Sequence, residues 1–175
     1  MVVMFITNLP SYSWVEFGET TTLGQKAQSV TNGLVDAYNR VNRIRLNNLK
    51  PGTKYYYKVV SKEITGFEPY KLTYGDSLES NLLSFTTPAE QADDMRCLIM
   101  NDIHDRPYSI PHLMQLNGAE PYDFVFFNGD VFDYQWGEQQ IVDHMLQPCT
   151  SAFASEKPFM YVRGNHETRG KYSRD

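Results

Sequence analysis

In RCLIMNDIHD, residues 96–105, an apolar run leads directly into a group of polar side chains. The same pattern returns in FVFFNGDVFDY at residues 124–134 and in FMYVRGNHE at residues 159–167. Short continuous apolar runs are typical of strands buried on both faces of a parallel sheet. The polar segments between the runs predict helices over residues 108–118 and 138–153. The second half of the chain is therefore expected to fold in the order β-α-β-α-β.

The polar residues that follow the three runs should meet at one edge of the predicted sheet. In open parallel sheets, ligands bind along the edge where the strands have their carboxyl ends. The groups here are D-x-H, G-D-x-x-D and G-N-H-E, and such a mixed oxygen and nitrogen set is typical of Zn, Fe, Mn or Mg sites. About one chain in five of this length has a D-x-H by chance, but only about one in a thousand has a G-N-H followed by an acid. All three in order predict a metal site.

The order of these motifs, over residues 94–175, resembles that of the calcineurin-like metallophosphoesterase family. The resemblance implies hydrolysis of phosphate mono- or diesters by a hydroxide that bridges two metal ions, divalent or trivalent and of unknown identity. It also implies a role for each matching residue. Asp102 and His104 would bind the first metal, Asp130 would bridge both metals, and Asn165 would bind the second. His166 with Asn165 would contact the substrate, and His166 would stabilise or protonate the leaving group. Asp133 would hydrogen-bond His166 and hold the orientation of its ring.

Two features depart from the family pattern. Purple acid phosphatases have a tyrosine three residues after the bridging aspartate, where this chain has Asp133, so we expect no tyrosinate-to-iron colour. The family also has a lone His and a G-H-x-H motif after the three motifs found here, and neither follows Glu167. The remaining histidines, His112 and His144, lie in predicted helices. We therefore expect a fragment that lacks the C-terminal half of the domain, binds metal weakly or not at all, and is catalytically inactive.

Residues 1–88 have a different pattern, in which short β-branched and aromatic stretches alternate with turn signals, as in an all-β sandwich. LNNLKPGTKY at residues 46–55 resembles the E–F corner of fibronectin type III domains, where a tyrosine hydroxyl bonds to backbone upstream; here this would be Tyr55. A sandwich of this kind before the catalytic domain is similar to the arrangement in purple acid phosphatases. The expected strands are Val2–Thr7, Ser13–Glu19, Asn42–Leu46, Tyr55–Ser61, Lys71–Tyr74 and Leu82–Thr86, with less regular ones between Gln25 and Tyr38. Val2–Thr7 looks like the second strand of such a sandwich, so its first strand is expected to be missing.

Composition limits the partners and the location of the protein. The chain has 16 Lys and Arg against 21 Asp and Glu, a net charge of -5, which argues against binding to a nucleic-acid backbone. Met1–Ile6 is a short apolar run without a basic segment, and no stretch approaches the roughly 18 apolar residues of a membrane span. The family resemblance, rather than the composition, implies a phosphate ester as partner, and we expect no signal peptide in this chain. Analogy with exported relatives suggests an extracytoplasmic location, periplasmic or secreted.

Several residues have more than one interpretation. Asp105 is expected to cap a helix or to lie in solvent, and His144 to be an ordinary helix residue. Glu167 either supports the metal ligands or is a loop charge, and Trp136 either packs or lines the cleft. The alternating Tyr55 and Tyr57 are expected in a half-buried strand, with an aromatic binding platform as the alternative. For the whole chain, the alternative to an enzyme is a non-enzymatic binding or adhesion module with a degenerate phosphatase scaffold.

Overall fold

A computed structural model describes residues 1–91 and 94–174, and the chain divides into two units, Met1–Glu90 and Gln91–Asp175. This boundary falls between the two ranges distinguished in the sequence, residues 1–88 and 94–175, and residues 92–93 lie outside the described part. Each unit is described separately below. Within the described residues, every helix is too short or too polar to cross a membrane.

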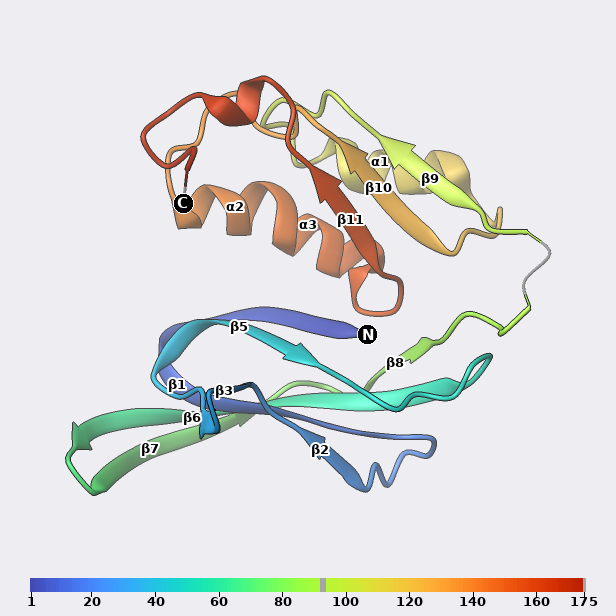
Figure 1. Cartoon of the computed structure of the whole chain (residues 1–175). Coiled ribbons are helices and arrows are strands. Elements are labelled where there is room, and N and C mark those ends of the chain that lie inside the picture. Colours follow the sequence, from blue (N-terminus) through green and yellow to red (C-terminus); the bar gives the residue numbers. More distant parts are fainter. Residues whose placement is uncertain (92–93, 175) are drawn as a thin grey trace. The chain divides into compact units, whose positions relative to one another are not determined.

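An antiparallel sheet forms most of the first unit (Figure 1). Its strands run in the order β2-β1-β6-β7, and β5 and β8 pair with β1 and β6 respectively. The bounds of these strands are β1 Val2–Gly18, β2 Gln25–Ala27, β5 Asn39–Arg45, β6 Lys54–Glu68, β7 Lys71–Glu79 and β8 Leu83–Thr86, and a separate pair is formed by β3 Val30–Thr31 and β4 Leu34–Val35. An antiparallel β region before the parallel one is thus confirmed, while the likeness to fibronectin type III domains stays a prediction.

The predicted division of the first segment into two strands was wrong. Residues 2–18 form one continuous strand, β1, which changes partner along its length. Its first part, up to Ile6, pairs with β5, and its second part, from Ser11, pairs with β6. The register against β5 shifts between these two residues. Pro10 lies in this irregular stretch, where its missing N–H is tolerated.

Tyr55 lies in the core of the first unit with only 1% of its surface exposed. The N–H of Lys50 donates a hydrogen bond to its hydroxyl oxygen at 3.0 Å, so the predicted bond to upstream backbone is confirmed. Tyr57 is also buried, and both rings pack with Phe85. Two buried rings cannot act as a binding platform, so the structural interpretation of this alternation holds.

We expect Tyr55→Phe to lower the free energy of unfolding of the first unit by about 1 kcal/mol, because the part-buried hydrogen bond from the Lys50 N–H is lost while the ring packing stays. Urea denaturation followed by circular dichroism would measure the loss. Tyr70→Phe is the matched control, since the Tyr70 side chain is fully exposed. Equal stability of the two variants would contradict the prediction.

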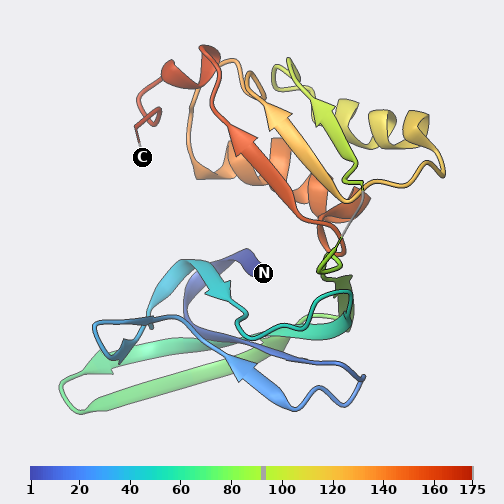
Figure 2. The same ribbon diagram turned by 45° about the vertical axis from the view of Figure 1, so that its right-hand side comes forward.

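Three parallel strands form the sheet of the second unit, in the order β11-β10-β9. They are β9 Cys97–Met100, β10 Phe124–Asn128 and β11 Phe159–Val162, and the predicted apolar runs coincide with them. Because the strands follow one another in a single direction across the sheet, two right-handed crossovers place both connecting helices on the same face. Figures 1 and 2 both show the helices behind the three strands. The predicted parallel β-α-β-α-β fold is confirmed.

The two connections are α1, Ser109–Asn117, and one longer helical segment. The longer segment alternates between α-helical and π-helical turns: α2 Glu138–Ile141, η1 Val142–Leu146, α3 Gln147–Cys149 and η2 Thr150–Ala154. Pro148 lies inside it and has no N–H for an α-helical hydrogen bond. Wider π turns on both sides let the helix pass the proline without ending.

The core of the second unit lies between the sheet and these helices. It contains Val125 and Phe127 of β10, Ile110 of α1, and Met145 and Cys149 of the longer segment. Burial raises the pKa of the Cys149 thiol to about 12. The opposite face of the sheet is open, because the alternate residues on β9 and β11 are exposed: Ile99 by 60%, Met160 by 57% and Val162 by 45%. Within the described residues the expected burial of both faces is therefore wrong.

Candidate metal centre

The turns that follow β9 and β10 have an unusual backbone. Asp102, His104, Asp105 and Asp130 all have φ between 50° and 56°. Such left-handed conformations are uncommon for residues with side chains, although Asp and His adopt them more readily than most. Residues in sparsely populated conformations concentrate at functional sites. The strained backbone thus marks the same turns that the motifs do.

The turns after β10 and β11 touch each other through two glycines. A Cβ atom on Gly129 would lie 2.8 Å from the Cα atom of Gly164, and one on Gly164 would lie 2.6 Å from the backbone nitrogen of Asp130. Any side chain at either position would force these turns apart. The glycines of the second and third motifs therefore allow close backbone approach, which brings Asp130 beside the third motif.

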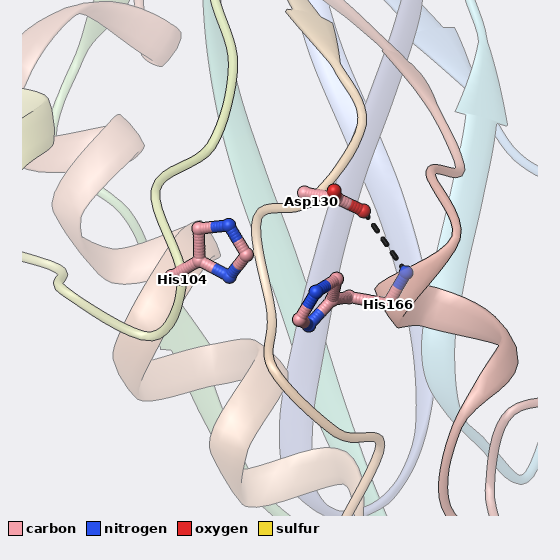
Figure 3. A group of neighbouring side chains, drawn as sticks. All are labelled: His104, Asp130 and His166. Atoms are coloured by element: carbon pink, nitrogen blue, oxygen red, sulfur yellow. Dashed lines mark hydrogen bonds between the residues drawn. The ribbon is translucent and has the colours of Figure 1, made fainter.

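His104, Asp130 and His166 come together from three separate turns (Figure 3). One potential ligand atom from each lies within 4.8 Å of the other two, and all three residues are partly buried. The two imidazole rings are nearly perpendicular, with centroids 4.5 Å apart. One oxygen of Asp130 also accepts the backbone N–H of His166 at 2.9 Å, which joins the second and third turns. Two imidazoles and a carboxylate at this separation fit a single cation.

Asp102 lies beside this group, although it is not a member of it. Its Oδ1 is 3.4 Å from His104 Nε2, and its other oxygen accepts a hydrogen bond from Asn101 at 2.6 Å. The hydrogen bond from Asn101, with a smaller contribution from His104, lowers the pKa of Asp102 below its ordinary value. An ionised, exposed carboxylate next to His104 is available as a further ligand.

Asp133 contacts both histidines. Its Oδ1 lies 2.8 Å from His104 Nδ1 and 3.5 Å from His166 Nδ1. We predicted the contact with His166, whereas the shorter one with His104 was not predicted. The hydrogen bond to Asp133 raises the pKa of His104, against a smaller opposing effect of desolvation. When Nδ1 donates to Asp133, Nε2 carries the lone pair that a metal needs, which is the usual arrangement of a metal-binding histidine.

The side chain of Asn165 lies between Asp130 and Arg169. One terminal atom of its amide is 3.0 Å from Asp130 Oδ2, and the other is 3.2 Å from Arg169 Nη2. With the NH2 group toward Asp130, both contacts are hydrogen bonds. With the oxygen toward Asp130, two oxygens would approach each other and would repel unless they shared a cation. Binding of a metal by Asn165 thus requires the second orientation of this amide.

Glu167 is completely buried, with no exposed surface. Its two oxygens accept backbone N–H groups from Asp130 at 2.9 Å, Phe132 at 3.0 Å and Gly164 at 2.7 Å. These donors belong to the second and third turns, so one carboxylate ties both together. Of the two interpretations of Glu167, a solvated loop charge is excluded by its burial, and support for the neighbouring site residues remains.

The expectation that Asp105 caps a helix or lies in solvent was wrong. Helix α1 begins four residues later, at Ser109, without a side-chain cap. Asp105 instead accepts hydrogen bonds from the Asp133 backbone, Gln140 and His144. Partial burial opposes its ionisation, but these bonds together lower its pKa. The signal missed in the sequence was the four-residue spacing of Gln140 and His144, which places both on one helix face.

The model of the calcineurin-like phosphoesterase family matches residues 95–175. These residues form a calcineurin-like phosphoesterase domain. The match includes all three motifs and every residue of the candidate metal centre. A comparison of the chain with curated proteins gives no match.

Two solved structures resemble the chain in fold. Purple acid phosphatase PPD1 from yellow lupin (Lupinus luteus) seeds matches with a TM-score of 0.67 and 18% identity, over 95% of this chain and 33% of that one. PhoD matches with a TM-score of 0.51 and 15% identity, over 95% of this chain and 34% of that one. At these identities the likeness concerns the fold alone. The chain spans about a third of the length of the structures it matches.

Proposed function

We propose that this chain carries part of the catalytic site of a metal-dependent phosphoesterase that hydrolyses phosphate mono- or diesters. The observation that supports this most directly is the convergence of His104, Asp130 and His166 at the carboxyl end of a parallel sheet, within a phosphoesterase domain. The donor set fits a cation, because imidazole and carboxylate are common ligands of Zn, Fe and Mn. Asp102 and Asn165 lie next to this group as further oxygen donors.

Bound metal ions would supply positive charge for the phosphoryl oxygens and would lower the pKa of a bound water to give a hydroxide nucleophile. In our proposal, Asp102, His104 and Asp130 hold the first ion, and Asp130 and Asn165 hold a second. Asp133 fixes the ring of His104 so that Nε2 faces the ion. The backbone bond from His166 to Asp130 keeps the third turn against this set.

His166 is proposed to contact the phosphoryl group and to protonate the leaving oxygen. Arg169 lies 3.1 Å from its Nδ1. With Arg169 in this position, the guanidinium donates to a lone pair on Nδ1. To act as the acid, the ring would instead carry N–H groups on both nitrogens, and Nδ1 would then donate to Asp133, whose Oδ1 is 3.5 Å away.

We further propose that the chain alone binds metal weakly and does not turn over substrate. A second ion would have only Asp130 and Asn165 as protein ligands. The two other histidines of the sequence, His112 and His144, do not belong to the candidate metal centre. His144 bonds to Asp105, and His112 is exposed on α1. An under-filled site has low affinity. An extracytoplasmic location stays a prediction.

The purified 175-residue chain tests these proposals. We expect millimolar Mn²⁺ to broaden the amide NMR signals of residues 102–105, 130–133 and 164–167 selectively, while signals around His112 stay sharp. Chromogenic phosphate mono- and diesters with added Mn²⁺ or Zn²⁺ should be hydrolysed no faster than by the metal alone. Uniform or absent broadening would refute the metal site and favour the non-enzymatic alternative. Turnover by the chain would refute its proposed inactivity.

A further inference from the structure

Side chains from the long helical segment fasten the loop that follows the second motif. Gln140 uses both ends of its amide for this purpose. Its oxygen accepts the backbone N–H of Trp136 at 2.8 Å, and its nitrogen donates to the backbone oxygen of Tyr134 at 2.7 Å. The same nitrogen also donates to Asp105 Oδ1 at 2.7 Å. One half-buried glutamine therefore joins the helix, the 133–136 loop and the first motif.

Asp105 completes this connection from the first motif. Its Oδ2 accepts the backbone N–H of Asp133 at 2.8 Å, and its Oδ1 accepts from His144 Nδ1 at 2.8 Å as well as from Gln140. The backbone N–H of Asp105 donates in turn to Val131 at 2.9 Å. Asp105 thus holds the second-motif turn through its side chain and through its backbone.

We propose that Asp105, Gln140 and His144 form a positioning clamp, which fixes the backbone of Asp133 so that its carboxylate orients His104. The inference rests on the proposed function, since the orientation of His104 matters because His104 is proposed to bind metal. Asp133 reaches His104 Nδ1 at 2.8 Å. A displacement of the 133–136 loop would lengthen that bond and release the ring. Carboxylates that orient metal-binding histidines affect metal affinity although they do not touch the metal.

Gln139 lies on the same helix as Gln140 but takes no part in the clamp. Gln139 is exposed and donates to Asp143 on its own helix at 2.9 Å. Such a contact is typical of a solvated helix face. Gln140, one position later, instead contacts two other segments of the chain. Gln139 is therefore the matched control for Gln140.

The test compares Gln140→Glu with Gln139→Glu in the full chain. A glutamate at position 140 keeps the acceptor for Trp136 but cannot donate to Asp105 or to Tyr134, and it adds a negative charge beside Asp105. We expect the Asp133 amide to exchange with deuterium at least about 10-fold faster, the His104 ring NMR signals to shift, and the Mn²⁺ concentration for half-broadening to rise about 10-fold. The control should match the unmodified chain.

A second pair of variants tests the clamp without adding a negative charge beside Asp105. His144→Ala removes one donor to Asp105, and alanine preserves the helix. His112→Ala, at an exposed position of helix α1, is its control. We expect His144→Ala to accelerate exchange of the Asp133 amide and to shift the His104 signals in the same direction as Gln140→Glu.

The readouts separate failure of the clamp from failure of the proposed function. Asp133 exchange and His104 signals that match the controls in both variants would overturn the clamp, whatever the metal does. Altered signals with unchanged Mn²⁺ affinity would overturn its positioning role. If Mn²⁺ never broadens the site in the unmodified chain, the proposed function fails, while exchange and ring signals still decide whether the clamp holds Asp133.

Discussion

Glu167→Ala is expected to lower the unfolding free energy of the phosphoesterase domain by on the order of 3–5 kcal/mol. The substitution leaves the backbone N–H groups of Asp130, Phe132 and Gly164 without their acceptor, at a position that has no access to water. Each buried donor without a partner costs about 1–3 kcal/mol, and the lost side chain leaves a cavity in addition. Urea denaturation followed by hydrogen exchange of β10 peptides would measure the loss, with β6 of the first unit as internal reference.

Two further variants define the cause of this effect. Glu167→Gln keeps the volume but replaces one acceptor oxygen with an NH2 group, which must face at least one backbone donor, so an intermediate loss of about 2 kcal/mol is expected. Glu120→Ala removes an exposed glutamate from the same domain and should have almost no effect. Wild-type stability of Glu167→Ala would show that its three hydrogen bonds do not hold the turns together.

Asp130→Ala is expected to remove the selective Mn²⁺ broadening, which corresponds to an affinity at least about 100-fold weaker. The residue is the carboxylate of the three-residue group and the proposed bridge between two ions. Its removal would leave the first ion with Asp102 and His104 and the second with Asn165 alone. The measurement is the Mn²⁺ titration of the amide and imidazole NMR signals described above.

The controls for this variant separate the lost charge from a displaced loop. Asp130→Asn keeps an oxygen for the backbone N–H of His166 and removes only the charge, so it should also lose Mn²⁺ while the His166 amide signal stays in place. Asp143→Asn changes an exposed carboxylate on the long helical segment and should leave the titration unchanged. Site-selective broadening in Asp130→Ala would contradict the proposed ligand role.

The sequence predicted those features that depend on local pattern. Each apolar run became a parallel strand, as its length and composition indicated, although only one face of the sheet is buried in the described residues. Polar motifs at the ends of three parallel strands must lie at one edge, and for that reason the grouping of His104, Asp130 and His166 needed no knowledge of the tertiary packing. The Tyr55 bond was also predictable, since its partner, Lys50, lies only five residues away.

Features that depend on distant partners were not predictable in this way. The interactions of Asp105 involve residues 28, 35 and 39 positions away, so its local sequence indicated only a cap or a solvated charge. Glu167 has partners up to 37 positions away, and its burial follows from contact between two turns. Continuation of β1 through Pro10 likewise depended on two different pairing strands. In each case tertiary contacts override the local preference.

The open face of the β9-β10-β11 sheet also affects how much the domain can tolerate. Ile99, Met160 and Val162 are exposed to water, so their apolar side chains contribute little to the free energy of folding. Stability then depends on the single layer between the strands and the helices, together with the polar contacts that join the turns. Because the free energy of unfolding is small, the loss of one buried carboxylate such as Glu167 removes a large share of it. The same loss would be a smaller share in a domain with both sheet faces packed.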